Sequence, residues 1–297
     1  MHPKQSSDTA KLVARSIALA SKDQDLAKLL PIDAAEITTS LDPIRGGWFT
    51  IAWHSELMRW AFFKAMDFMV PGIVAHYVIR KRAIETEVRH ALSNGATQLV
   101  ILGAGYDTLA WRLSKEFEKV NFVEFDHPAT QAAKKAKLGN TKNFHYNAVD
   151  LEKKSFKSAV AECRDIQPDV PTVVVAEGLT MYLPEQAVTN LIGDLSGLAG
   201  LGGRVIFTFM EKDNDGSIHF RDQQKLVEKW LGWRSERFLW GTDRKNLACL
   251  LDTKHLQKVK ILDHSDLRTQ FLEPLGIEDL RIARGECLCY CSPSPDV

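Results

Sequence analysis

The chain has 297 residues, of which 45% are hydrophobic, and its 38 basic side chains equal its 38 acidic ones in number. That length suits one large α/β domain or two small ones. Because the charges balance, the protein has no strong electrostatic attraction to nucleic acid or to an anionic membrane. We therefore expect neither as a partner and predict a small-molecule partner. The sequence has no run of 18 apolar residues and no signal-like start, which predicts no transmembrane helix and a cytoplasmic location.

The five cysteines are odd in number and lack the spacing of a disulfide framework, which is typical of a reducing compartment. Cys287, Cys289 and Cys291 alternate in "CLCYC" and would share one face of a strand. Zinc sites usually combine two separated cysteine pairs, and the sequence has no second pair. We therefore expect small buried side chains here and no metal site.

Residues 1–95 have a mostly helical pattern, interrupted at Pro71–Gly72, and we assign them to an N-terminal helical cap. From residue 98 onward, apolar strands alternate with amphipathic helices. Strands are predicted at 98–103, 120–126, 143–150, 171–178, 202–210, 258–263 and 285–291, and helices at 107–117, 128–138, 184–199, 243–253 and 265–272. This alternation predicts an α/β fold with a parallel sheet that is covered on both faces.

Residues 211–240 interrupt the alternation, because they are first polar and then aromatic and fit neither a strand nor a simple helix. We predict that they form a lid insertion or a pocket wall. The aromatic side chains there indicate an apolar or ring-bearing ligand, although core packing would explain them equally well. They are Trp230, Trp233, Phe238 and Trp240.

The stretch "LGAGYDT" follows the first predicted strand and predicts a ligand-binding turn. Gly103 and Gly105 let the backbone bend sharply and let a ligand approach closely. Thr108 occupies the place of the third glycine in a dinucleotide fingerprint, and the lysine of a P-loop is missing. Asp107 would repel a pyrophosphate, which favours a cationic, phosphate-free cofactor such as S-adenosylmethionine, although a helix N-cap is an equally good role for it.

Acidic residues also follow the next three strands, and the carboxyl ends of parallel strands border the ligand crevice of such sheets. Asp126 is the expected acceptor of ribose hydroxyl hydrogen bonds, with Glu124 as the competing acid. Asp150 and Leu151 could hold the amino group and the ring face of an adenine. Glu177 faces the same crevice, where a carboxylate is costly to bury without a partner such as a ligand amine.

Five segments in order, "LGAGYDT", "EFDHP", "AVDLE", "AEGLTMYLP" and "FLWGTDR", resemble the leucine carboxyl methyltransferase-like family of class I S-adenosylmethionine-dependent methyltransferases. That family includes bacterial small-molecule O-methyltransferases and eukaryotic phosphatase methyltransferases, and the resemblance covers roughly residues 75–291. It implies a Rossmann-like, doubly wound, mostly parallel seven-stranded sheet with an antiparallel last strand at 96–297. It also implies that the cap at 1–95 contributes to the substrate pocket.

The same resemblance implies roles for single residues. An arginine before the glycine loop would grip the methionine carboxylate of the cofactor; "IRKRAIE" offers Arg80 first and Arg82 second, because it departs from the family's usual Arg-Thr-Arg. Gly103 and Glu177 would meet the methionine amine, and Ala104, Gly105 and Asp107 are further candidates for binding the cofactor. Asp126 would bind the ribose, and Asp150 with Leu151 the adenine. The expected product is S-adenosylhomocysteine, and no metal is expected.

Methyl transfer from a sulfonium depends mainly on distance and angle, so alignment can supply about 7–11 kcal/mol. A carboxylate acceptor, with a pKa of about 4, needs no general base at neutral pH. We therefore predict methylation of a small-molecule carboxylic acid to its ester, with Tyr182 and Arg80 as candidate catalytic residues. An alcohol acceptor would instead want a base, for which His76, His127 and His219 are candidates.

Three alternatives remain at the level of sequence. Tyr77 and Lys81 have the tyrosine–lysine spacing of short-chain NAD(P)-dependent oxidoreductases, but they precede the glycine loop instead of following it. The acceptor could be a protein C-terminal carboxylate, whereas a tRNA carboxyl is disfavoured by the neutral charge. A degenerate, cofactor-binding protein without turnover is the third alternative. No oligomeric state follows from the sequence.

Overall fold

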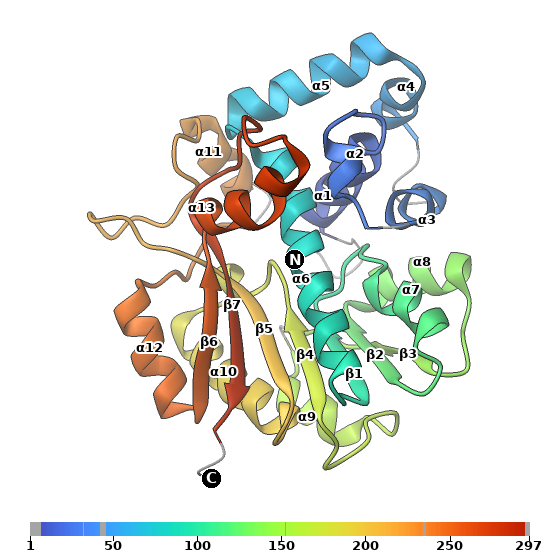
Figure 1. The fold of residues 1–297 in the computed structure, drawn as a ribbon, viewed down its shortest axis with the longest axis vertical. Coiled ribbons are helices and arrows are strands. Elements are labelled where there is room, and N and C mark those ends of the chain that lie inside the picture. The colour runs from blue at the N-terminus through green and yellow to red at the C-terminus, as the bar shows by residue number, and fades with distance from the viewer. Residues whose placement is uncertain (1–6, 32, 42–45, 152, 234–235, 295–297) are drawn as a thin grey trace.

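The computed structural model describes residues 7–31, 33–41, 46–151, 153–233 and 236–294, and its centre is one seven-stranded sheet (Figure 1). The strands are β1 (Gln98–Leu102), β2 (Asn121–Asp126), β3 (Phe144–Ala148), β4 (Thr172–Ala176), β5 (Arg204–Met210), β6 (Leu256–Leu262) and β7 (Glu286–Pro293). Each predicted strand is present, with ends that differ by a few residues. Strand prediction succeeded because each strand is a short apolar run bounded by turn residues.

The strand order is β3-β2-β1-β4-β5-β7-β6. The pairs from β3 to β5 are parallel, and β7 pairs antiparallel with both β5 and β6. The predicted doubly wound, mostly parallel sheet with an antiparallel last strand is confirmed. Chain order reverses between β1 and β4, and ligands bind such sheets at this switch point, beyond the carboxyl ends of the strands.

Alternate side chains of the central strands enter two separate cores, because successive residues of a strand point to opposite faces. On β1, Leu99 and Ile101 join one core, whereas Val100 and Leu102 join the other. The first core also takes in α6 (Ile73–Ser93), α7 (Leu109–Glu116) and α13 (His264–Leu267), and the second takes in α9 (Phe156–Glu162), α10 (Glu185–Ala199) and α12 (Arg244–Thr253). The sheet is thus covered on both faces, as predicted, and α8 (Pro128–Leu138) packs beside β3.

Five helices before α6 lie together beyond one end of the sheet (Figure 1). They are α1 (Asp8–Ala20), α2 (Leu26–Leu29), α3 (Ala34–Ser40), α4 (Trp48–His54) and α5 (Glu56–Met69). The predicted break at Pro71–Gly72 separates α5 from α6, and Gly72 has φ +77°. A Cβ at Gly72 would lie 2.7 Å from the backbone of Arg281, so only glycine fits this turn.

Residues 211–240 contain more regular structure than the sequence analysis expected. Helix α11 (Lys225–Trp233) lies inside this insertion, and its apolar residues Val227 and Leu231 are buried. The short α9 was also not predicted; Phe156 and Ala159 fix its buried face. In both cases a short helix forms by packing on neighbouring elements, which local pattern alone does not reveal.

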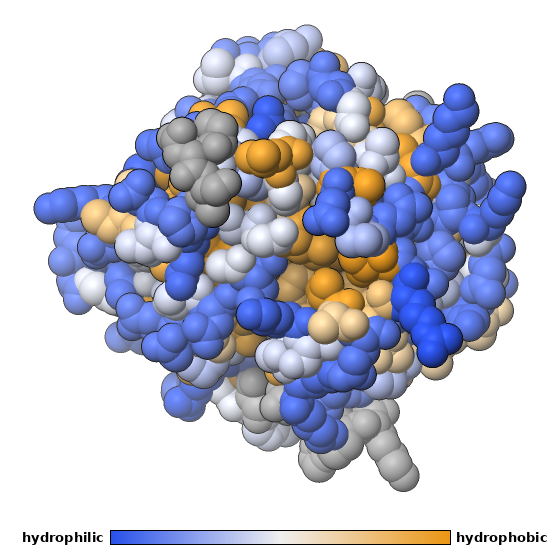
Figure 2. Space-filling view, turned by 90° about the horizontal axis from the view of Figure 1, so that it is seen from below, coloured by the Kyte–Doolittle hydropathy of each residue, from blue (hydrophilic) through white to orange (hydrophobic). Residues whose placement is uncertain are grey.

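The surface combines a largely hydrophilic face with apolar side chains grouped near its centre, as Figure 2 shows from the side opposite α5. At the other end, α4 and α5 leave several large apolar side chains exposed, among them Trp60 and Phe68. Within the described residues, no single helix has the length and apolarity to cross a membrane; only α5 and α6 taken together, bent by 89°, meet that criterion.

Candidate functional site

A cavity of about 990 Å³ lies at the predicted switch point, next to the glycine loop that follows β1. Its wall combines residues from the ends of β1, β2 and β4 with residues from α1, α6 and the insertion. Ligand pockets typically measure about 300–1,000 Å³, so this cavity is large enough for a nucleoside-sized cofactor beside a second small molecule. We call the part next to the glycine loop the cofactor end, and the part next to Tyr77, Tyr182 and Glu236 the acceptor end.

The glycine loop has the conformation that its sequence predicts. Gly103 and Gly105 have φ of +68° and +55°, a region that favours glycine. The Gly103 amide donates to the carbonyl of Phe125 over 2.8 Å, which ties the loop to β2. A Cβ at Gly103 would lie 3.6 Å from the Leu179 side chain, which is an ordinary contact distance. Ala104 also lines the cavity.

Asp126 lies at the end of β2 and its carboxylate is oriented by backbone amides. Gly105 donates to Oδ2 and His127 donates to Oδ1. Burial outweighs these two hydrogen bonds and raises the pKa of Asp126 above its ordinary value. The competing acid, Glu124, lies deeper, is fully buried and pairs with Lys134 over 2.6 Å outside the cavity wall. Of these two acids, Asp126 lines the cavity and Glu124 does not.

Asp150 and Leu151 lie just after β3 and line the same cavity. Lys153 pairs with Asp150 over 2.8 Å, and Leu151 packs against the core that contains α9 and α10. The predicted pairing of an acid with an apolar residue is therefore present at the edge of the cofactor end. This combination can accept from an exocyclic amine while packing on a ring face.

Arg80, on α6, links two carboxylates that come from different strands. Its Nε lies 2.8 Å from Oε1 of Glu177, and its Nη1 contacts Oε2 of Glu286. Burial alone would raise the pKa of Glu286, but Arg80 and His76 outweigh it and lower that pKa to about 2. The sequence analysis missed Glu286, because it lies at the start of the cysteine-rich strand and is far from the glycine loop in the chain.

Lys81, the neighbour of Arg80, pairs with the acid of the glycine loop. Its Nζ lies 2.7 Å from Oδ2 of Asp107 and 3.0 Å from Oε2 of Glu177. Burial raises the pKa of Asp107, but Lys81 more than offsets it, so the pKa lies below its usual range. Asp107 also accepts from the amides of Thr108 and Leu109, but the N-cap of α7 is Thr108, one residue after the position that the N-cap alternative expected. The sequence argument treated Asp107 as an unpaired charge, and the structure corrects this.

Arg82 does not join the site. Its side chain is exposed and lies outside the cavity wall, because two residues along a helix turn a side chain by about 200°. Two of the three candidate histidines are also outside the wall. His76 is buried against Glu286, and His219 is bonded to Ser217 and to the carbonyl of Phe220. Only His127 lines the cavity, at the cofactor end.

Two tyrosines line the acceptor end, Tyr77 from α6 and Tyr182 from the turn after β4. Burial raises the pKa of Tyr77 to about 12 and that of Tyr182 above its ordinary range, so both hydroxyls stay protonated at neutral pH. Within the described part of the chain, neither hydroxyl forms a hydrogen bond. Both are therefore neutral donors that are available to a ligand.

The insertion forms part of the acceptor end. Trp230 and Phe238 line the cavity, and the Phe238 ring lies 5.7 Å from that of Tyr182. Trp233 is exposed, and Trp240 packs in the core on the other face of the sheet, so these two aromatics do not face a ligand. The amide of Leu239 donates to the carbonyl of Met181, which holds the end of the insertion beside Tyr182.

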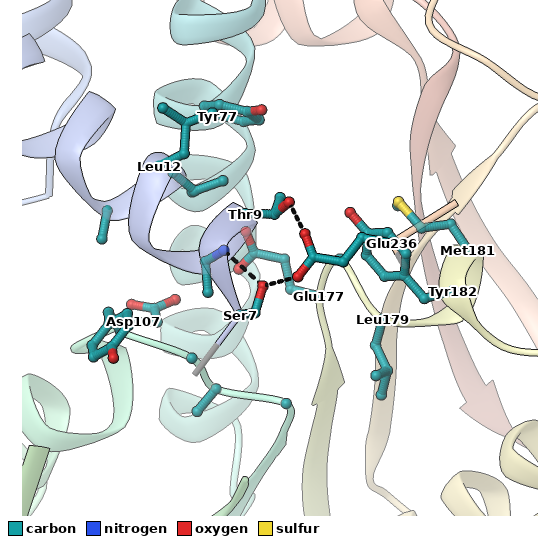
Figure 3. Close-up of a pocket in the computed structure, with 18 of the residues that line it drawn as sticks. Ser7, Thr9, Leu12, Tyr77, Asp107, Glu177, Leu179, Met181, Tyr182 and Glu236 are labelled. Atoms are coloured by element: carbon teal, nitrogen blue, oxygen red, sulfur yellow. Dashed lines mark hydrogen bonds between the residues drawn. The ribbon is translucent and has the colours of Figure 1, made fainter. Parts of the chain in front are cut away.

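The acceptor end also contains a carboxylate that the sequence analysis did not single out. Glu236 lines the cavity, and its oxygens accept from the hydroxyls of Ser7 and Thr9 at the start of α1 (Figure 3). Ser7 and Glu236 are 229 positions apart, so no local pattern could indicate this contact.

The three cysteines of β7 are buried side by side in one core, as expected for small apolar side chains. Cys289 and Cys291 have their sulfurs 3.4 Å apart. Over the described ranges, no group of three or more histidine, cysteine, aspartate or glutamate side chains is arranged to hold a metal ion.

Two known proteins that are similar in sequence share one description. A protein named "Putative S-adenosyl-L-methionine-dependent methyltransferase/SAV474" from Streptomyces avermitilis is 32% identical over 136 residues, 44% of this chain and 47% of the relative. A relative of the same description from Mycobacterium sp. (strain KMS) is 26% identical over 225 residues, 75% of this chain and 71% of the relative. The chain thus spans about half the length of the first of these relatives.

Solved structures share the fold. The crystal structure described as a putative methyltransferase from Thermobifida fusca YX has a TM-score of 0.60 at 15% identity, covering 81% of this chain and 89% of that one. A duf574 family protein from Streptomyces avermitilis also has a TM-score of 0.60, at 13% identity, covering 83% and 90%. The family model described as leucine carboxyl methyltransferase matches residues 22–196, more than half of the sequence. The chain belongs to the leucine carboxyl methyltransferase family.

Proposed function

We propose that this protein is an S-adenosylmethionine-dependent methyltransferase that converts a small-molecule carboxylate to its methyl ester. One observation carries the proposal: a single cavity joins the acids at the ends of β2, β3 and β4 to an apolar chamber that contains two neutral tyrosine hydroxyls. The named relatives and the family support methyl transfer from this cofactor. The carboxylate acceptor is our own refinement.

The residues of the cofactor end fit an adenosyl cofactor with an amino-acid tail. The glycine loop lines the cavity where the tail would lie, and the oriented carboxylate of Asp126 would accept from the ribose hydroxyls. Asp150 and Leu151 would hold the adenine. Glu177 would receive the ammonium group, while Arg80 would bind the carboxylate of the tail.

When bound, S-adenosylmethionine supplies an electrophilic methyl group; an acceptor oxygen forms the new O–C bond as the S–C bond breaks, and sulfur keeps that electron pair as a neutral thioether. A carboxylate acceptor gives up no proton in this step, so none of the residues has to act as a base. The task of the protein is to hold both reactants in line, which can supply about 7–11 kcal/mol. Tyr182 would donate to the acceptor carboxylate and fix its orientation.

The test is an assay with cofactor labelled in its methyl group and matched panels of aromatic acids and aromatic alcohols. Methyl esters are cleaved by base and release labelled methanol, whereas methyl ethers are not. We expect base-labile label from the acids only. Label confined to base-stable products would contradict the carboxylate acceptor, and failure of S-adenosylhomocysteine to bind in calorimetry would contradict the cofactor. Asp126→Ala serves as the cofactor-deficient control.

A further inference from the structure

Glu236, like Asp126, has no ion pair among the described residues, but its partners are two side-chain hydroxyls instead of backbone amides. It is only 7% exposed, and both of its oxygens are bound by hydroxyls, those of Ser7 and Thr9. Among the described residues it forms no ion pair. A carboxylate taken out of water with neutral partners alone is costly, so its retention at this place calls for a cause.

None of the described cations that line the cavity pairs with Glu236, and each contacts other carboxylates instead. Arg80 contacts Glu177 and Glu286, and Lys81 contacts Asp107 and Glu177. The two remaining cations are occupied as well: Lys153 pairs with Asp150, and Arg112 pairs with Glu85. Among the described residues that line the cavity, no cation is therefore left to pair with Glu236, and a cationic ligand would supply one.

The surroundings of Glu236 favour an organic cation over a hydrated ion. The same end of the cavity is lined by Trp230, Leu231 and Phe238. The ring centroids of Phe238 and Phe220 are 6.0 Å apart. Aromatic faces attract ammonium groups and pack against an apolar body. Figure 3 shows the Glu236 carboxylate pointing toward Ser7 and Thr9, on the side away from Met181. Glu236 and Tyr182 both line the cavity. Carboxylate and tyrosine hydroxyl thus border one chamber.

We propose that the acceptor is an apolar or aromatic acid that also carries an ammonium group, and that Glu236 binds this group. This proposal rests on the proposed function, in which Tyr182 would orient the carboxylate of the acceptor. The ammonium end lies against Glu236, between α1 and the insertion. Glu236 is a specificity-determining residue in this arrangement and takes no part in the methyl transfer.

A purely structural role has to be separated from this one. The hydrogen bonds from Ser7 and Thr9 also join α1 to the insertion, so Glu236 could act only as a link between the two. The double variant Ser7→Ala, Thr9→Val removes that link and keeps the carboxylate. Glu236→Gln keeps most of the link and removes the charge. The matched control is Glu228→Gln, an exposed carboxylate on α11 outside the cavity wall.

The experiment titrates two acids into the protein, with and without saturating S-adenosylhomocysteine, by calorimetry. The probes are 4-(aminomethyl)phenylacetic acid and 4-methylphenylacetic acid, which differ only in the ammonium group. We expect the wild type to bind the first at least about tenfold more tightly, as for a close charge pair. Glu236→Gln should abolish this preference, while the double variant and Glu228→Gln retain it.

Three outcomes would overturn the proposal: no preference in the wild type, a preference that survives in Glu236→Gln, or an equal loss in the double variant. Melting temperatures of all variants show whether each one is folded. A wild-type protein that prefers the amine-bearing acid but does not bind S-adenosylhomocysteine would contradict the proposed function alone. A wild-type protein that binds S-adenosylhomocysteine but shows no preference between the two acids would contradict only the role of Glu236.

Discussion

At the cofactor end of the cavity, Asp126, Glu177 and the glycine loop lie directly after strands and are held by backbone hydrogen bonds and ion pairs. At the acceptor end, the wall comes from α1, α6 and the insertion, which are distant in the chain and share few polar contacts. Under the proposed function, the sheet would fix the position of the cofactor, while helices packed beyond it would determine the acceptor. Four changes test this difference between the two ends.

The largest effect is expected from Arg80→Met. This change leaves Glu177 and Glu286 buried without their shared guanidinium, so the free energy of unfolding should fall by about 3–5 kcal/mol. Binding of S-adenosylhomocysteine should be lost with it. Arg82→Met is the matched control, because its side chain is exposed, and it should change stability by less than about 0.5 kcal/mol. Chemical denaturation measures both; similar effects of the two changes would contradict the assignment of Arg80.

Glu286 predicts a pH dependence of stability. Its folded pKa, about 2, lies below its ordinary value of 4.5, so its contribution is fully present above pH 4.5. That contribution is lost as the pH falls from 4.5 toward 2, by roughly 3 kcal/mol in total. Glu286→Gln should flatten this part of the curve of unfolding free energy against pH. An equally steep acid limb in the variant would show that other groups cause it.

Asp126→Ala should weaken only the cofactor end. Loss of a carboxylate that accepts from ribose hydroxyls should raise the dissociation constant of S-adenosylhomocysteine by about 10–100-fold. Binding of aromatic acids should change little, because Asp126 belongs to the cofactor end, where its partners are the amides of Gly105 and His127. Asp252→Ala, an exposed aspartate on α12, is the control. Unchanged cofactor affinity in Asp126→Ala, measured by calorimetry, would remove the basis of the cofactor assignment.

The smallest effect is expected from Tyr182→Phe at the acceptor end. Loss of one neutral hydrogen bond to the acceptor should lower kcat by about 5–10-fold. The affinity for S-adenosylhomocysteine and the melting temperature should stay as in the wild type, because the hydroxyl has no partner within the described chain. Steady-state kinetics separate the cases: a loss confined to the cofactor KM would place Tyr182 at the wrong end of the cavity.

The same contrast explains what the sequence could predict. The strands, the glycine loop, Asp126, Asp150 and Glu177 were predictable because each lies at a fixed place relative to a buried strand. The order of the sheet follows the family pattern as well. The fold and the cofactor end are therefore encoded locally.

The acceptor end was harder to predict for a physical reason. Ser7, Thr9 and Glu236 meet through tertiary packing over more than 220 positions of sequence separation. Lys81 was visible only as part of a possible oxidoreductase pair, and its contact with Asp107 depends on how α6 lies against the glycine loop. Of the four aromatics singled out from the sequence of the insertion, Trp230 and Phe238 line the cavity and the other two do not, which spacing alone cannot tell.

Helix α6 supplies side chains to both ends of the cavity: Ile73 and Tyr77 to the acceptor end, Arg80 and Lys81 to the cofactor end. A helix advances about 1.5 Å and turns about 100° per residue, so the angular offset between these groups is set by residue count alone. One residue inserted between Tyr77 and Arg80 would rotate the acceptor-end side chains of α6 relative to its cofactor-end side chains. The helix could then keep the contacts of one pair of side chains only by losing those of the other pair. Under the proposed function, this one helix would therefore hold the sites of the methyl donor and of the acceptor in a fixed relative position.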